Sequence, residues 1–91
     1  SGGHGMNMYC LYILKSNTKN WHYIGSTSDI ENRIREHNAG EVRSTKAHRP
    51  LTILYKEEFN DKASARKREL FLKKTVKARK ELFEKIDGPI F

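Results

Sequence analysis

The fold of this chain is decided by residues 23–38, which read YIGSTSDIENRIREHN. β-Forming residues precede Gly25, and a pattern with helical spacing follows it, so the stretch predicts a strand end, a glycine turn and a helix. Ser28 and Glu31 stand three residues apart and form a capping-box pattern, which predicts Ser28 as the cap of the helix. Gly40 follows the helical pattern and is typical of a helix end.

Two polar side chains of this helix lie at the edge of its apolar side. Ile30 and Ile34 form the apolar stripe, and Arg33 and His37, four residues apart, are stacked beside it one turn apart. A cation and an imidazole at the edge of a buried face are well placed to line a cleft. Taken alone, the pair is also compatible with ordinary surface residues of a helix.

The chain is short and basic, with 91 residues, 32% of them charged, and a formal net charge of +7. This length allows one domain with a modest core. The charge favours a polyanionic partner such as nucleic acid, and a solvated basic surface is the alternative. Residues 1–5, SGGHG, are interpreted as a cloning remnant, so the domain is taken as residues 6–91.

Cysteine content and hydropathy exclude several classes of protein. Cys10 is the single cysteine, which excludes a disulfide framework and a thiolate zinc site and fits a reducing compartment. No run approaches the roughly 20 apolar residues that span a bilayer, and no signal-peptide pattern precedes the first strand. We therefore expect a cytoplasmic protein without a membrane partner.

Two segments before the helix predict an antiparallel hairpin. Residues 8–14, MYCLYIL, are continuously apolar and rich in β-formers, with Leu11 on one face and Tyr12 on the other. The polar run 15–20 forms the loop, and residues 21–25 form the second strand. The hairpin brings Tyr12 beside Tyr23, either as part of a site or as a simple cross-strand aromatic pair.

The second half of the chain predicts one more strand and two helices. Residues 51–59 form the strand after Pro50, and Asp61 caps a helix through residue 74. Thr75 caps a last helix to about Ile86, which residues 87–89 close. The expected fold is α/β, a small sandwich with a three-stranded, mainly antiparallel sheet flanked by helices in the order β-β-α-β-α-α.

Chemically suited residues now fall in a distinctive order and spacing. The set comprises Tyr12, Tyr23-Ile24-Gly25, Arg33 eight residues beyond the glycine, His37 four later, and Glu69 in the helix after the third strand. In this order the chain resembles the GIY-YIG nuclease superfamily, most closely its small stand-alone bacterial members, over essentially all of residues 6–91. It departs at two points, since Cys10-Leu11-Tyr12 keeps only the tyrosine of the first motif and no asparagine follows Glu69.

The resemblance implies a metal-dependent endonuclease that hydrolyses DNA phosphodiester bonds, in DNA repair or recombination, with RNA not excluded as substrate. Arg33 suits phosphate, and Glu69 suits one Mg²⁺ or Mn²⁺ ion, because Mg²⁺ needs only one or two protein carboxylates. The resemblance makes Tyr12 the general base, and a metal ion and Arg33 would lower its pKa from about 10. Tyr23 would orient water or phosphate, and His37 would bond to the tyrosine pair or relay a proton. We expect all five to converge on one face.

Basic residues outside this set predict a nucleic-acid-binding surface. The expected contacts to phosphates are Arg43, Lys46, Arg49, Lys73 and Lys74. No base-reading motif is present, so binding would depend on the structure of the nucleic acid and not on its sequence.

Three alternatives stay open. The chain could be a nucleic-acid-binding module of the same fold with weak or no catalysis, or a protein-interaction domain, although no protein partner is identifiable. Glu69 could simply form a helix ion pair with Lys73 or Arg66. His22 and His48 are assigned to the surface or to backbone contacts.

Overall fold

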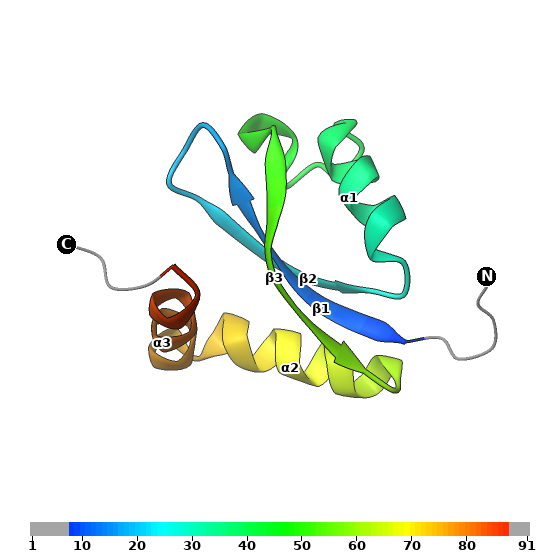
Figure 1. Ribbon diagram of the computed structural model, residues 1–91, viewed down its shortest axis with the longest axis vertical. Helices are drawn as coiled ribbons and strands as arrows, with labels where there is room; N and C mark the ends of the chain where they lie inside the picture. Colours follow the sequence, from blue (N-terminus) through cyan, green and yellow to red (C-terminus); the bar gives the residue numbers. More distant parts are fainter. Residues whose placement is uncertain (1–7, 88–91) are drawn as a thin grey trace.

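The computed structural model describes residues 8–87, which contain three strands, three α-helices and one short 3₁₀ helix (Figure 1). The elements are β1 (Tyr9–Ser16), β2 (His22–Thr27), α1 (Ile30–Asn38), η1 (Lys46–His48), β3 (Leu51–Phe59), α2 (Lys62–Lys74) and α3 (Val76–Asp87). The expected order β-β-α-β-α-α is confirmed. The interpretation of residues 1–5 and the closing turn expected beyond residue 87 lie outside the described residues.

The sheet has the order β2-β1-β3, and both strand pairs are antiparallel. β1 is the central strand, so its backbone groups are paired on both sides, and residues 10–14 are all buried. In the predicted hairpin, Tyr12 lies opposite Gly25 and Leu14 lies opposite Tyr23. This register brings the two tyrosine rings together diagonally on one face.

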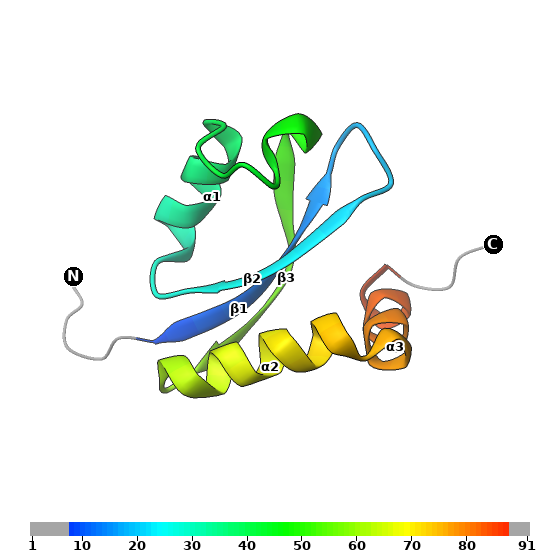
Figure 2. The same cartoon turned by 180° about the vertical axis from the view of Figure 1, so that it is seen from behind.

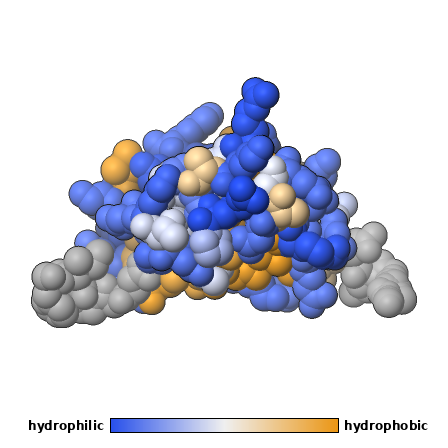
Figure 3. Space-filling view, turned by 90° about the horizontal axis from the view of Figure 1, so that it is seen from above, coloured by the Kyte–Doolittle hydropathy of each residue, from blue (hydrophilic) through white to orange (hydrophobic). Residues whose placement is uncertain are grey.

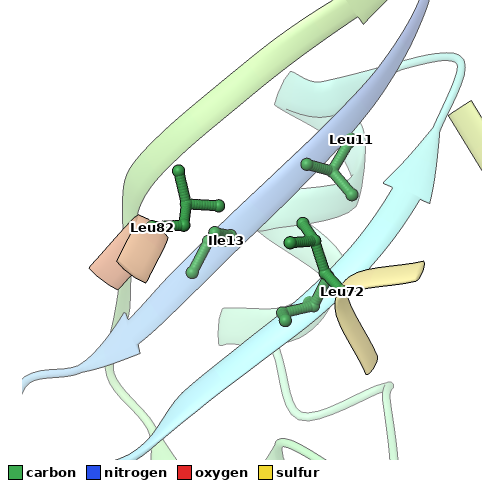
Figure 4. Packing of buried hydrophobic residues seen from close by; sticks show 5 residues of the cluster. Leu11, Ile13, Leu72 and Leu82 are labelled. Atoms are coloured by element: carbon green, nitrogen blue, oxygen red, sulfur yellow. The ribbon is translucent and has the colours of Figure 1, made fainter. Parts of the chain in front are cut away.

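The helices cover opposite faces of the sheet. α1 lies on one side, and α2 and α3 lie on the other (Figures 1 and 2). Leu11 and Ile13 of β1 point to the α2–α3 side, where they form an apolar cluster with Ile24, Leu72 and Leu82 (Figure 4). We call this side the apolar layer.

The α1 side contains the other residues of β1. Tyr12 and Leu14 are buried there with Leu51, and Ile30 and Ile34 of α1 pack against them. The alternation predicted for the first strand therefore separates its side chains into two layers, as period-2 geometry requires. We call the α1 side the polar layer, because buried polar side chains lie beside these apolar ones.

A β-bulge interrupts the pairing of β1 with β3. Ile13 pairs with Tyr55 and Leu14 pairs with Ile53, which leaves Leu54 as the extra residue. Leu51 therefore packs in the polar layer, while Tyr55 packs against the apolar layer, although both residues have odd numbers in one strand.

The start of α1 differs from the prediction. The cap is Asp29, whose carboxylate accepts the backbone N–H of Asn32 at 3.1 Å, so the predicted Ser28–Glu31 capping box is wrong. An aspartate one residue later reaches the same orphan amides and starts the helix at Ile30. The helix end is as predicted, because Gly40 has a φ of 84° and donates its N–H to the carbonyl of His37.

The junction of α2 and α3 is a single residue. Asp61 caps the start of α2 as predicted. Thr75 is the C-cap of α2, and its carbonyl accepts the N–H of Arg79 in α3. The Arg79 guanidinium donates to the carbonyls of Leu72 and Lys73. It thereby satisfies orphan groups at the end of α2 and ties the two helices together.

Candidate active site

Tyr12 lies at the centre of the polar layer. Its side chain is 1% exposed, and its phenol oxygen is 2.9 Å from His37 Nε2. Gly25 is opposite it on β2, and a Cβ at that position would lie 2.7 Å from the phenol oxygen. The missing side chain of Gly25 is therefore what gives the phenol its space. The Tyr23 ring is 6.1 Å away between centroids.

His37 is held by side chains on both of its ring nitrogens. The last turn of α1 places it in the polar layer, where its residue is fully buried. Nε2 faces Tyr12, and Nδ1 is 2.8 Å from the hydroxyl of Thr45, which is buried as well. That hydroxyl lies 3.3 Å from the carbonyl of Val42. Three chain segments thus form one hydrogen-bonded row.

Arg33 lies one turn before His37 on α1 and joins the buried phenol to the surface. Its guanidinium is 2.9 Å from the Glu36 carboxylate, and its side chain is 36% exposed. Hydrogen bonds first to Tyr12 and then to Glu36 raise the pKa of Arg33 above its usual range. A permanent positive charge therefore stands beside the phenol, with one side open to a ligand.

Burial controls the protonation of both buried aromatic groups. It raises the pKa of Tyr12 to about 12, because the hydrogen bond from Arg33 lowers that pKa by less than burial raises it. The predicted lowering therefore does not occur in the protein alone. Burial, followed by the charge of Arg33, lowers the pKa of His37 to about 4. At neutral pH the pair is a phenol beside a neutral imidazole.

Glu69 is buried on the opposite side of β2 and is fully hydrogen-bonded. Its residue is 3% exposed; Oε1 accepts from the Ser26 hydroxyl at 2.7 Å and from Arg66 at 3.2 Å. Oε2 accepts from Lys73 Nζ at 2.6 Å. Burial raises the pKa of this carboxyl, but the bonds from Lys73 and Ser26 outweigh burial, so the pKa lies below its usual range. The helix ion pairs considered above are therefore present.

The five residues meet around an edge of the sheet and not on one face. Tyr12, Tyr23, Arg33 and His37 lie in the polar layer. Ser26 is paired with Leu11 and therefore points to the α2 side, where it holds Glu69. β2 is the edge strand, and Lys73 Nζ lies 5.9 Å from the Tyr23 ring centroid as well as against Glu69. The expected single face is therefore wrong.

The fit of a divalent ion depends on Glu69. Within residues 8–87 no three His, Cys, Asp or Glu side chains gather into a metal-ligand group. A hard cation such as Mg²⁺ needs only one or two protein carboxylates and keeps several waters, and Glu69 is ionised. Its partners Lys73 and Arg66 have side chains 43% and 58% exposed, so both can turn outward. The donor chemistry of Glu69 fits an ion that displaces these cations.

The predicted nucleic-acid-binding residues occupy two places. Arg43, Lys46 and Arg49 are exposed between α1 and β3, and Arg49 donates to the Lys46 carbonyl at 2.9 Å. The face with α1 and η1, at the top of Figure 1, is mostly hydrophilic (Figure 3). Lys73 and Lys74 form the last turn of α2, where Lys73 is paired with Glu69 and Lys74 is exposed.

Several interactions near the site were not anticipated from sequence. His48, assigned to the surface, stacks on Trp21 with ring centroids 3.7 Å apart, and His22 stacks on Phe83 at 4.5 Å. Strand alternation, which places Ser26 and Gly25 on opposite faces, could have predicted that Ser26 points to α2. Thr45 lies in an irregular segment without periodicity, and no signal points to it.

The fold and the sequence together define the class of protein. A sequence model of the GIY-YIG catalytic domain matches residues 8–82, and the chain belongs to this family. The superfamily consists of endonucleases that generally use a divalent metal and act on nucleic acid. No helix within residues 8–87 has the length and apolar character to cross a membrane.

The similar proteins are members of the group UPF0213. The chain is 33% identical to the UPF0213 protein YazA of Bacillus subtilis over 78 residues, which are 85% of this chain and 78% of that protein. It is 33% identical over 75 residues to the UPF0213 protein VNG_2274C of Halobacterium salinarum, covering 81% and 96%. The solution NMR structure of the UPF0213 protein BH0048 from Bacillus halodurans superposes with a TM-score of 0.54 at 26% identity, covering 89% and 86%. These names state no activity.

Proposed function

We propose that this protein is a divalent-metal-dependent endonuclease that hydrolyses DNA phosphodiester bonds in the cytoplasm. Its catalytic residues are Tyr12, Tyr23, Arg33, His37 and Glu69. The observation that best supports this proposal is the buried contact between Tyr12 and His37 beside the partly exposed guanidinium of Arg33. This contact supports the proposal because hydrolysis of a phosphodiester requires a group that transfers protons next to a cation that binds phosphate.

Hydrolysis at this site requires two proton transfers at the Tyr12 phenol oxygen. A water oxygen bonds to phosphorus while the bond from phosphorus to the leaving oxygen breaks. The water gives a proton to the Tyr12 phenol oxygen, and the phenol proton passes to His37 Nε2. Because the pKa of Tyr12 is about 12, a free phenolate is rare at neutral pH, so the two transfers occur together. Arg33 holds a non-bridging phosphate oxygen, and Tyr23 orients the water.

Glu69 is the residue proposed to hold the divalent ion, Mg²⁺ or Mn²⁺. When bound, such an ion polarises the phosphate and stabilises charge on the leaving oxygen. Lys73 and Arg66 neutralise the carboxylate when no ion is present, and their exposed ends allow them to turn to DNA phosphates instead. When Lys73 turns from Glu69 to a phosphate, Lys73 and Lys74 contact the substrate backbone together with Arg43, Lys46 and Arg49.

A nucleic-acid-binding module without catalysis is the second candidate. The observation that favours it is the complete pairing of Glu69, whose two oxygens already accept from Ser26, Arg66 and Lys73. A carboxylate retained only as the centre of an ion-pair cluster would not need a metal. The departure at Cys10-Leu11-Tyr12 from the first family motif points the same way.

The two candidates differ in a cleavage experiment. Labelled single-stranded, duplex, flapped and branched DNA, with matching RNA, are incubated with Mg²⁺, Mn²⁺ or chelator. Tyr12→Phe should reduce cleavage by about 100-fold or more, since general-base catalysis contributes about that much. Glu69→Gln should abolish the metal-dependent cleavage and retain binding. A preference for flapped or branched DNA would support a role in repair or recombination.

The chain offers a matched control for each substitution. Tyr55→Phe also removes a hydrogen-bonded phenol, here one that donates to the Glu57 carboxylate, and Glu57→Gln also neutralises a carboxylate bound by an arginine, both away from the candidate site. Both controls should cleave like the wild type, and thermal unfolding monitors folding. Salt-sensitive binding without any cleavage by the wild type would favour the binding module.

A further inference from the structure

We infer that Thr45 is a positioning residue that holds His37 as the Nδ1–H tautomer, so that Nε2 accepts the proton of Tyr12. Nothing in the family motifs includes Thr45, which lies eight residues beyond His37 in the segment between α1 and η1. The hydrogen bonds that join Tyr12, His37 and Thr45 decide which ring nitrogen of His37 carries the proton.

The Thr45 end allows two directions for the bond to His37. The one proton of the Thr45 hydroxyl can go to His37 Nδ1 at 2.8 Å or to the carbonyl of Val42 at 3.3 Å, which also accepts the Thr45 N–H at 3.1 Å. When the hydroxyl donates to Val42, the bond to His37 runs from Nδ1–H to the Thr45 oxygen. A neutral imidazole has one N–H, so Nε2 is then left as an acceptor.

The Tyr12 end selects between these two directions. The buried phenol proton needs an acceptor, and Arg33 beside it has only N–H donors. His37 Nε2, at 2.9 Å, is the acceptor that the polar layer provides. If Nε2 carried a proton, the buried O–H of Tyr12 would lose this acceptor.

Burial makes this arrangement specific. Tyr12, His37 and Thr45 are all at most 1% exposed, so bulk water does not compete for the bonds. The groups that face the ring are Tyr12 from β1, Tyr23 from β2, and Arg33 with Glu36 from α1. Burial and Arg33 keep the imidazole neutral, which is the state in which the position of the single ring proton matters.

The consequence for hydrolysis rests on the proposed function. As the O–H bond of Tyr12 breaks, its proton bonds to Nε2, and the water's proton replaces it on the phenol oxygen. His37 becomes an imidazolium whose Nδ1–H still donates to Thr45, and the extra proton leaves to solvent after the step. Without the Thr45 hydroxyl, nothing holds the ring proton of His37 on Nδ1. A ring that carries its proton on Nε2 cannot accept the proton of Tyr12.

The test observes the ring protons directly. Nitrogen-15 NMR of the His37 ring at pH 7 is recorded for the wild type, Thr45→Val, which keeps the shape without the hydroxyl, and Thr45→Ser, which keeps the hydroxyl. We expect a protonated Nδ1 and an unprotonated Nε2 in the wild type and in Thr45→Ser, and a shift towards protonated Nε2 in Thr45→Val. A wild-type ring with its proton on Nε2 overturns the inference, even if Thr45→Val fails to fold.

A kinetic comparison completes the test. On a substrate that the wild type cleaves, Thr45→Val should lower kcat by about 10–100-fold, which is at or below the lower end of a general-base contribution. KM should be unchanged, and Thr45→Ser should be close to wild type. Unchanged kcat in Thr45→Val overturns the catalytic consequence. Absence of cleavage by the wild type contradicts the nuclease proposal instead, and the ring protons still test the role of Thr45.

Discussion

The two layers formed by strand β1 are equally buried but differ in the chemistry of the side chains that they bury. In the apolar layer, Leu11 and Ile13 are fully buried against Leu72 and Leu82. In the polar layer, Tyr12 and His37 are just as inaccessible, but their polar atoms are hydrogen-bonded. Alternate residues of one strand therefore contribute to apolar packing on one face and to buried hydrogen bonds on the other.

The difference between the layers is one of energy. Burial of an apolar side chain stabilises the fold by about 1.5–3 kcal/mol, whereas a buried hydrogen bond contributes a net of about 0.5–1.5 kcal/mol after desolvation. The apolar layer should therefore dominate stability. In the polar layer, a buried polar group that loses its hydrogen bond is costly. This layer should therefore control the orientation and protonation of its side chains. Four changes test this division.

The apolar layer should be the most sensitive to truncation. Leu72→Ala removes a side chain that is 1% exposed and should lower the free energy of unfolding by about 2–5 kcal/mol. Leu70→Ala, on the same helix at a residue that is 37% exposed, is the control and should cost well under half as much. Urea unfolding measures both, and equal losses would contradict the division between layers.

The polar layer should make stability depend on pH. The pKa of His37 is about 4 in the folded protein against 6.5 ordinarily, so the unfolded chain takes up its proton first as pH falls. Stability should be complete above pH 6.5 and fall by on the order of 3 kcal/mol towards pH 4. Urea unfolding of the wild type and His37→Gln across this range isolates the effect, because the other groups titrate in both. Parallel curves would show that His37 is not kept neutral by burial.

Gly25 should matter both for the packing of the Tyr12 ring and for the contact of Tyr12 with His37. Gly25→Ala places a Cβ 2.7 Å from the Tyr12 phenol oxygen, and this overpacking should cost about 1–3 kcal/mol and displace Tyr12 from His37. Adding Tyr12→Phe removes the clashing oxygen but leaves Tyr12 Cζ at 2.8 Å and Tyr23 Cε2 at 2.9 Å, so the double variant should recover only part of the loss. Additive losses in a double-mutant cycle by thermal unfolding would show that the phenol oxygen does not contribute to the overpacking.

The surface ion pair of α1 should matter least. Arg33 and Glu36 form an ion pair at 2.9 Å, but both side chains are about one third exposed. Glu36→Gln should change the free energy of unfolding by no more than about 0.5 kcal/mol, with the remaining difference removed by salt. A loss comparable to that of Leu72→Ala would place this pair among the determinants of the fold.

Regular patterns made most of the fold predictable from sequence. Alternation in residues 8–14 assigned Tyr12 and Leu11 to different faces, and the segment after Pro50 gave β3 its observed bounds. Local signals were less reliable where two residues compete for one task. Asp29 caps α1 in place of Ser28, because both can reach the orphan amides and only the backbone decides between them.

The sequence proposed a set of candidate site residues but not their arrangement. The order of motifs pointed to Tyr12 and Glu69 as candidates but could not place them on opposite sides of an edge strand. Thr45 belongs to no repeating pattern, and its contact with His37 exists only because the segment after α1 folds back over the ring. The burial of Glu69 depends on α2 packing against β2, a tertiary event that local spacing does not encode.

Because of the bulge at Leu54, the number of residues in β3, and not only their identity, determines which layer each side chain of β3 joins. The bulge reverses the parity of β3, so that Leu51 and Tyr55 serve different layers. A deletion of one residue at this point would leave a plausible eight-residue strand, yet one half of it would present its side chains to the wrong layer. β3 should therefore tolerate many substitutions at exposed positions such as Thr52 but not insertions or deletions. A surface loop, in contrast, is expected to tolerate insertions and deletions.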